Sequence, residues 1–297
     1  MLSELRIEGL KGMEKGTLLT RKQIQHELCL MLEKIDKFLE QNNIRYSIMS
    51  GTMLGAVRHR GFIPWDDDTD IGILRADYDR LVKILKDQNE ISGNLSGIGF
   101  EINSNDFWPF IKIINKDILV KEDGISRKEN LWVDIFAFDE MPTKFLDFRF
   151  KEHVFLRKIL MHKSIADGFH SDGFHSNCNK GLKKNVWLLL EKFVDRVEKF
   201  VDREKLTRLY IDRCTKYNFR KNDLVNDWTW GGRTTSTVSR TLFDDLTEYQ
   251  FEDVVVKGFR DYDTYLKRIY GNYMELPPED QRVNHNVVAW KVKNSEE

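Results

Sequence analysis

The sequence of 297 residues is poor in features that mark secreted, membrane-spanning or nucleic-acid-binding proteins. Its three cysteines, Cys29, Cys178 and Cys214, are widely spaced and form no Cys-x-x-Cys pair, which favours packed thiols in a reducing compartment over a disulfide framework. Residues Met1 to Lys15 contain no signal-peptide core, and the most apolar short run, Val186 to Leu190, is too short to span a bilayer. Lysine and arginine number 47 against 48 aspartate and glutamate residues, so no basic excess points to nucleic acid. We therefore expect a soluble, cytoplasmic protein that does not bind nucleic acid.

The sequence does contain enough apolar residues, 41%, for a substantial core. Apolar residues recur at helical intervals from Arg21 to Gln41, after a capping box of Thr20 and Gln23. Short helices are predicted after Thr52 and from Leu74, and strands over 44–49, 68–74, 99–103, 107–115 and 131–138. Beyond Pro142 the pattern becomes helical, over 143–166, 182–201 and 203–218. We therefore predict an α/β or α+β core over residues 1–142 and a mainly helical part over 143–297 that packs on the core.

One internal repeat is clear: Asp167 to Ser171 is repeated at once as Asp172 to Ser176. Its glycine content is typical of a surface loop. His170 and His175 lie near Cys178, but no fourth ligand is spaced to complete a zinc site, so we expect no metal here.

The most informative segment runs from Ser50 to Asp70 and ends in four aspartates within five positions. Apolar residues flank the acidic cluster on both sides, which indicates that it leads into a buried strand. Because side chains alternate along a strand, Asp68 and Asp70 point to one face. Two carboxylates side by side offer the oxygen ligands that Mg²⁺ or Mn²⁺ prefers. The alternatives are a calcium site, for which EF-hand spacing is missing, and a simple acidic turn.

Asp134 is a third candidate carboxylate. It lies in the otherwise apolar run Leu131 to Phe136, where an ionised group is costly unless it is paired or metal-bound. A salt bridge to a lysine or arginine is the simpler explanation for Asp134 alone. Beside Asp68 and Asp70, it becomes the third metal ligand or the general base.

Ser50, Gly51 and Thr52 form a glycine-containing turn between a predicted strand and a helix. Backbone N–H groups at such a turn bind phosphate well. Such turns are also common helix starts, so the prediction of a phosphate cradle depends on the closeness of the aspartates.

These residues resemble the LicD family of phosphotransferases, which includes the fukutin-type sugar-phosphate transferases. The resemblance lies in Gly51 to Ile73, in Val133 to Phe136, and in a C-terminal block that comprises Tyr265–Leu266, Tyr270–Met274 and Leu276–Pro278. Asn272 stands where an acidic residue is expected, which leaves the role of that position open. Residues 143–250 carry no part of the resemblance.

The resemblance implies an α+β fold of the nucleotidyltransferase type, with a mixed sheet flanked by helices, a divalent metal and a CDP-activated donor. Asp68, Asp70 and Asp134 would be the catalytic acids and the metal ligands. Ser50, Gly51 and Thr52 would hold the donor phosphates, and Arg58 and His59 would contact the donor's charge.

The function implied is transfer of phosphocholine from CDP-choline to a hydroxyl of a cell-surface glycan precursor, with release of CMP. Three alternatives stay open: polyol-phosphate transfer from CDP-ribitol or CDP-glycerol, nucleotidyl transfer from a nucleoside triphosphate, and a binding protein without activity. Choline recognition calls for an aromatic cage. The candidates for that cage are Trp108, Trp132, Trp228, Trp230 and Tyr273.

The predicted helix over 143–166 mixes aromatic residues with Lys151, Arg157 and Lys158. A basic amphipathic face would allow peripheral contact with anionic lipid at the inner face of the membrane, where a lipid-linked glycan acceptor would be reached. The simpler explanation is that the apolar face packs on the core.

Overall fold

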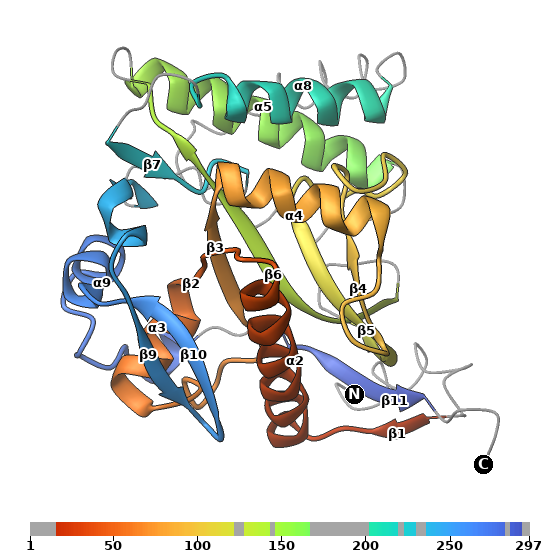
Figure 1. The fold of residues 1–297 in the computed structure, drawn as a ribbon, viewed down its shortest axis with the longest axis vertical. Coiled ribbons are helices and arrows are strands. Elements are labelled where there is room, and N and C mark those ends of the chain that lie inside the picture. Colours follow the sequence, from red (N-terminus) through yellow and green to blue (C-terminus); the bar gives the residue numbers. More distant parts are fainter. Residues whose placement is uncertain are drawn as a thin grey trace.

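The computed structural model describes residues 16–121, 128–142, 146–166, 202–218, 223–229, 236–282 and 286–292. At its centre is a mixed sheet with the strand order β1-β11-β5-β6-β3-β2, in which β4 pairs with β5, and β7 pairs with both β6 and β8 (Figure 1). A separate hairpin is formed by β9 and β10. The strands are β1 (Gly16–Leu18), β2 (Ser47–Ile48), β3 (Asp70–Leu74), β4 (Leu95–Ile98), β5 (Ile111–Lys121), β6 (Glu129–Glu140), β7 (Leu224–Asn226), β8 (Val238–Ser239), β9 (Leu246–Phe251), β10 (Val254–Phe259) and β11 (Val288–Val292).

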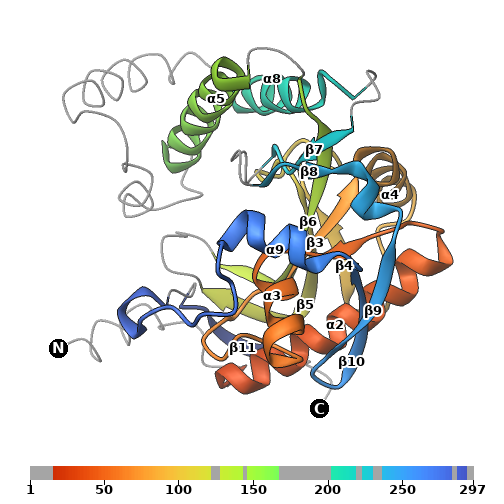
Figure 2. The ribbon, with the colours of Figure 1, turned by 90° about the vertical axis from the view of Figure 1, so that its left-hand side faces the viewer.

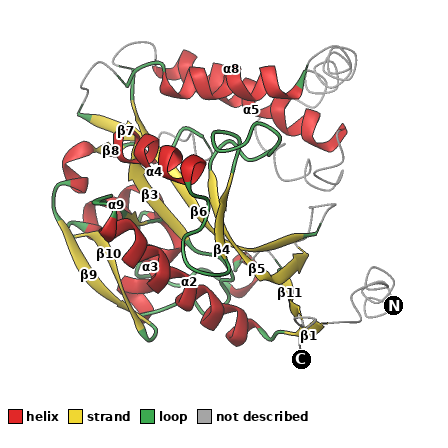
Figure 3. Cartoon of the chain, turned by 45° about the vertical axis from the view of Figure 1, so that its right-hand side comes forward, coloured by secondary structure: helices red, strands yellow, loops and turns green. Residues whose placement is uncertain are grey.

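The helices pack around this sheet and at one of its ends. They are α2 (Arg21–Gln41), α3 (Ser50–His59), α4 (Arg75–Asp87), α5 (Leu146–Ala166), α8 (Arg203–Thr215) and α9 (Tyr262–Tyr270), with 3₁₀ turns η4 (Arg240–Phe243) and η5 (Glu279–Gln281). The α2 helix contacts β6 and the hairpin, and α4 contacts β3 and β6. The α3 and α9 helices lie side by side (Figure 2), and α5 pairs with α8 at one end of the molecule (Figure 3). None of these helices is both long and apolar enough to cross a membrane.

In the first half of the chain, one predicted helix is confirmed and one predicted strand is wrong. The helix predicted over 21–41 is confirmed, and both hydrogen bonds of the capping box between Thr20 and Gln23 are present. The strand predicted over 99–103 is wrong, because these residues form turns in which the amides of Ile102 and Asn103 both donate to the Gly99 carbonyl. Gly99 has a φ of 145°, which ends β4 one residue earlier.

The second half contains more strands than predicted. Residues 146–166 and 203–215 are helical as expected, but the mainly helical character is not confirmed beyond residue 223. There β7 and β11 join the central sheet, and the alternating residues of β9 and β10 form a hairpin whose turn contains Glu252 at a φ of 51°. The helix predicted over 182–201 and the repeated pentapeptide lie outside the described residues.

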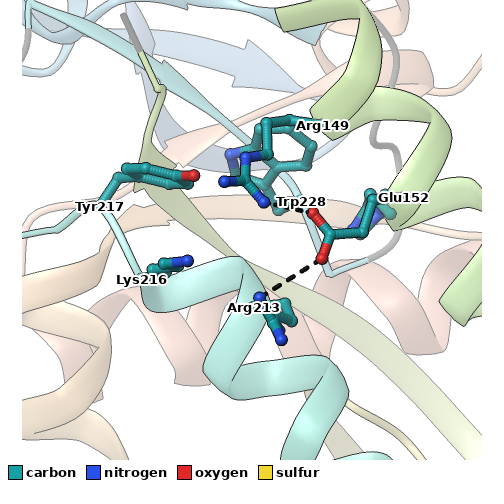
Figure 4. Close-up of a pocket in the computed structure, with 7 residues that line it drawn as sticks. Arg149, Glu152, Arg213, Lys216, Tyr217 and Trp228 are labelled. Carbon is teal, nitrogen blue, oxygen red and sulfur yellow. Dashed lines mark hydrogen bonds and ion pairs between the residues drawn. The ribbon is translucent and has the colours of Figure 1, made fainter. Parts of the chain in front are cut away.

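The α5 and α8 pair is joined by the buried side chain of His153. Its Nε2 lies 3.1 Å from the Tyr210 hydroxyl, and its ring packs edge-on against Trp228. A small cavity beside it is lined by Glu152, which bridges Arg149 at 2.6 Å and Arg213 at 3.4 Å (Figure 4). Leu160 and Met161 of α5 are buried in the core, and Phe150, Leu156 and Ile159 pack against it. Phe155 is 40% exposed, so membrane contact through this helix stays a prediction.

We expect His153 to make the protein sensitive to mild acid. Burial, and then the positive charge of Arg157, lower the pKa of His153 from 6.5 to about 3. Because the folded protein disfavours the protonated imidazole, this shift contributes to the free energy of unfolding in full above pH 6.5, and the contribution is lost as the pH falls towards 3. At pH 5 the free energy of unfolding is lower by about 2 kcal/mol. Urea unfolding at pH 7.5 and pH 5 should therefore show a larger fall for the wild type than for His153→Gln. Equal falls in the two proteins would contradict this assignment.

Candidate active site

Two of the three predicted acids lie on neighbouring strands, and Asp68 precedes the first residue of β3. Asp70 opens β3 and pairs in register with Asp134 of the parallel strand β6, so their side chains project from the same face of the sheet. Asp134 pairs in turn with Lys112 of the antiparallel strand β5. Lys112, Asp134 and Asp70 therefore form one row across three adjacent strands.

A cavity of about 630 Å³ opens beside this row. One side is polar and contains Ser50, Gly51, Arg58, Asp66, Asp68 and Asp70. A second part of the lining comes from residues far along the chain, Tyr270, Asn272, Tyr273, Glu275, Leu276, Pro277, Pro278 and Gln281. The cavity brings the acidic motif and the C-terminal block together, and its size suits a nucleotide-sized ligand.

Gly51 allows Asp66 to approach the start of α3. A Cβ atom added to Gly51 would lie 2.7 Å from Asp66 Oδ2, closer than real Cβ atoms come. The glycine is therefore needed for a close approach of the carboxylate. Asp66 was not among the predicted site residues, although it belongs to the same run of aspartates. Its neighbour Asp67 is buried away from the cavity, where its Oδ2 accepts a hydrogen bond of 3.1 Å from the Val287 amide.

Two residues of the predicted phosphate cradle have other partners. The Ser50 amide donates to the Tyr265 hydroxyl at 2.9 Å, although the residue lines the cavity. The Thr52 side chain is only 3% exposed, and its hydroxyl accepts a hydrogen bond of 2.8 Å from the Asp70 amide. Thr52 therefore holds the first residue of β3 in place without lining the cavity. Of the three cradle residues, Ser50 and Gly51 border the cavity and Thr52 does not.

This contact predicts a paired effect at position 52. Thr52→Val removes the acceptor and leaves the half-buried Asp70 amide without this partner, which is expected to lower the free energy of unfolding by about 1–3 kcal/mol. Thr52→Ser keeps the hydroxyl and should recover most of that loss. Chemical denaturation of the two variants measures the difference. If Thr52→Val were as stable as Thr52→Ser, the hydroxyl would have no such role.

Arg58 and His59 come from the last turn of α3. Arg58 lines the cavity, and its Nη1 donates to the Tyr273 carbonyl at 2.8 Å, which ties the two sides of the cavity together. His59 lies behind it, with Nδ1 3.5 Å from Arg58 Nε, and is not part of the cavity lining. Burial, and then the charge of Arg58, lower the pKa of His59, which favours its neutral form.

Asp134 lies in a nearly closed environment, with its side chain 14% exposed. Lys112 Nζ is 3.3 Å from Oδ1, and Trp132 Nε1 donates to Oδ2 at 3.1 Å. Burial raises the pKa of Asp134 to about 6, with a further increase from Asp68, although Lys112 and Trp132 act against it. The buried Oδ1 has the ion pair with Lys112 as its polar contact. With a pKa of about 6, Asp134 is mainly ionised at pH 7, and both of its oxygens face a partner, Lys112 at Oδ1 and Trp132 at Oδ2.

The donor set suits a hard divalent cation. Asp66, Asp68 and Asp70 border the same cavity. The pKa of Tyr270 is raised mainly by burial and next by the negative charges of these three aspartates. Carboxylate oxygens are the ligands of Mg²⁺ and Mn²⁺. Within the described part of the chain, however, no three His, Cys, Asp or Glu side chains are already gathered around one point as a metal site. The chemistry fits a metal ion, while the roles of Asp68, Asp70 and Asp134 as its ligands stay predictions.

The aromatic side chains proposed for a choline cage lie in several places. Trp108 and Trp132 enclose Lys112, whose ammonium is 4.0 Å from each ring centroid, so this pair holds a cation of the protein itself. Trp228 stacks on Phe150 in the α5 region. Tyr273 lines the cavity, and Trp230 is outside the described residues. Lys112 was missed by the sequence analysis, although a lysine inside an apolar strand is itself a signal of a buried charge.

Comparison with known proteins agrees with the motifs. Residues 43–166 match a family model described as LicD/FKTN/FKRP, nucleotidyltransferase domain. The chain is 26% identical over 269 residues to the lipopolysaccharide cholinephosphotransferase LicD of Haemophilus influenzae, covering 89% of this chain and 95% of that protein.

Shorter similarities are also found. An uncharacterized protein of Rickettsia prowazekii is 46% identical over 120 residues, 40% of this chain and 41% of that protein. The mouse ribitol 5-phosphate transferase FKRP is 27% identical over 124 residues, 36% of this chain and 23% of that protein. The chain therefore carries a LicD-family domain, at residues 43–166.

Proposed function

We propose that this protein transfers a substituted phosphate group, phosphocholine as the first candidate, from a CDP-activated donor to a hydroxyl of a glycan precursor, with release of CMP. The observation that carries the proposal is the cavity bordered by Asp68 and Asp70, beside which Asp134 projects from the same sheet face as Asp70. Similarity to a cholinephosphotransferase over 89% of the chain supports the choice of reaction. We also propose a nucleotidyltransferase-type core over residues 1–142; the family model matches residues 43–166.

The charge of the cavity supports a cationic headgroup. Asp66, Asp68, Asp70 and Glu275 border it, against the single arginine Arg58 among its described lining residues. A field of this sign favours the trimethylammonium of choline over a neutral polyol. Tyr270 adds aromatic surface on which such a cation would pack, whereas the Trp65 ring already has the Arg282 guanidinium over it at 4.7 Å. Ribitol or glycerol phosphate is the second candidate, supported by the similarity to a ribitol 5-phosphate transferase.

The same field repels the diphosphate of the donor, so the reaction calls for a divalent cation. Mg²⁺ or Mn²⁺ would be held by Asp68 and Asp70, with Asp134 next to them, and would neutralise charge on the phosphates. Arg58 lies where it can contact a donor oxygen and keeps the cavity wall in place through Tyr273. A pKa of about 6 leaves Asp134 mainly ionised at pH 7, so that it would accept the proton of the attacking hydroxyl.

The location of the reaction is also part of the proposal. We place it in the cytoplasm, at the inner face of a membrane that carries a lipid-linked glycan. Exposed Lys151 and Phe155 on α5 offer a basic and apolar contact. Co-sedimentation with anionic vesicles at low salt tests it. Absence of pelleting would leave α5 as a packing element.

The donor is identified by incubating the purified protein and Mg²⁺ with CDP-choline, CDP-ribitol or CDP-glycerol separately, with a lipopolysaccharide-type glycan as acceptor, and measuring CMP. We expect CMP from CDP-choline and no pyrophosphate from CTP. Release only from CDP-ribitol or CDP-glycerol would shift the proposal to polyol phosphate. No CMP from any donor, or pyrophosphate from CTP, would overturn it.

A further inference from the structure

Lys112 is the most deeply buried charged side chain beside the proposed site. It lies on β5, is 2% exposed, and has its ammonium 4.0 Å from the ring centroids of both Trp108 and Trp132. Phe110 forms a third side at 5.8 Å. The carboxylate that faces the ammonium in this aromatic box is that of Asp134, at 3.3 Å.

Packing alone does not explain a lysine at this position. Removing an ammonium from water is costly, and contact with aromatic faces offsets only part of the cost. Two apolar side chains in place of Lys112 and Asp134 would fill the same space without charges to desolvate, and replacing a whole buried pair in this way is often neutral or stabilising. Removing Lys112 alone would instead leave the Asp134 charge buried and uncompensated. The charge is therefore best explained by what it does to Asp134.

Lys112 and Trp132 hold the two oxygens of Asp134 from different sides. Lys112 faces Oδ1, whereas Trp132 Nε1 donates to Oδ2, and the same Trp132 ring forms one wall of the box around Lys112. The backbone is fixed as well, because the Asp134 amide donates to the Thr69 carbonyl at 3.0 Å, between Asp68 and Asp70. Box, ammonium and carboxylate are thus one connected unit, placed in the row that ends at Asp70.

We infer that Lys112 is a positioning residue for the transfer reaction: held between Trp108 and Trp132, its ammonium fixes the orientation in which Asp134 meets the reacting groups. The inference rests on the proposed function of this site. Partners that orient a catalytic or ligating group typically change its performance by about 10–100-fold when they are removed. Because Lys112 is separated from solvent by the box, it contributes to the rate rather than to donor binding.

The test compares Lys112→Met, which fills the box without a charge, with Lys116→Met, which removes an exposed lysine from the same strand. We expect Lys112→Met to lower kcat for CMP release by about 30-fold or more, with the donor KM within about threefold of the wild type. Lys116→Met should behave as the wild type. A kcat within threefold of the wild type, or a loss confined to KM, would overturn the inference.

A second readout does not depend on activity. In a crystal structure of metal-free Lys112→Met, we expect the Asp134 carboxylate to turn away from Trp132 Nε1. An unchanged carboxylate would count against the inference. If the wild type released no CMP from any donor, the proposed function would fail, and this structure alone would decide whether Lys112 orients Asp134. If Lys112→Met did not fold, Trp108→Leu, which opens the box and keeps Lys112, would be judged by the same two measurements.

Discussion

Asp68→Asn and Asp70→Asn are expected to lower the rate of CMP release by about 1,000-fold or more while the protein stays folded. A metal ion supplies several kcal/mol of stabilisation to a developing phosphoryl charge, and each 1.36 kcal/mol is a factor of ten in rate. Both carboxylates border the cavity in which the donor would lie. Removing one of them deprives the cation of a ligand at the reacting phosphate.

The stability of Asp68→Asn and Asp70→Asn should equal or exceed that of the wild type in the absence of metal. Asp66, Asp68 and Asp70 are close enough together for all three to raise the pKa of Tyr270, so they repel one another when no cation is bound. Replacing one with asparagine relieves that repulsion, and thermal unfolding without metal should occur at the wild-type temperature or above it. The measurements are CMP release at saturating donor and the midpoint of thermal unfolding.

Asp67→Asn is the matched control for the two variants. It changes the same residue type in the same motif, but Asp67 is buried and bonded to the Val287 amide, away from the cavity. We expect a loss of stability with activity largely kept. Wild-type turnover in Asp68→Asn or Asp70→Asn would refute the proposed role of these carboxylates, as would an equally large loss of activity in a folded Asp67→Asn.

Among substitutions that add a single methyl group to the motif, Gly55→Ala is expected to lower stability and activity most. A Cβ atom at Gly55 would press into the Gly61 carbonyl oxygen and lie 3.2 Å from the Ile63 amide nitrogen, both of them backbone atoms. Alanine favours a helix over glycine by about 1 kcal/mol, but overpacking against a backbone that cannot rotate away costs about 1–3 kcal/mol or more. We expect a net loss of stability, and displacement of the segment that leads to Asp66 and Asp68.

The activity of Gly55→Ala should fall further than its stability. A displacement of about 1 Å at a catalytic group can lower the rate about 100-fold. Gly51→Ala serves for comparison, because its added Cβ meets the end of the Asp66 side chain, which can move. Its stability should stay near that of the wild type. A Gly55→Ala protein as stable and as active as the wild type would show that the turn after α3 is not held against the helix.

The outcome at particular residues shows how far the sequence could be read. The capping box before α2 is a local feature, set by bonds within a few residues, and the structure contains it. The strand predicted over 68–74 begins only at Asp70, so Asp68 lies outside it, although both aspartates border one cavity. The strand predicted over 99–103 failed because a single glycine with positive φ ended β4. The strands beyond residue 223 were missed because their short runs gain stability only by pairing with partners elsewhere in the chain.

The sequence by itself determined the carboxylate motif and its likeness to one family, because both lie in runs of neighbouring residues. Only the tertiary structure decided that Asp134 pairs in register with Asp70, which lies 64 positions earlier in the chain. Strand register is fixed by pairing and burial across the whole sheet. The tertiary structure also decided that Thr52 supports β3 rather than borders the cavity, and that residues 270–281 form a second part of its lining. Lys112 shows the same limit. The sequence analysis did not single out this lysine, and the aromatic box and the Asp134 partner arise only when β5 and β6 align, because their side chains meet through the fold and not along the chain.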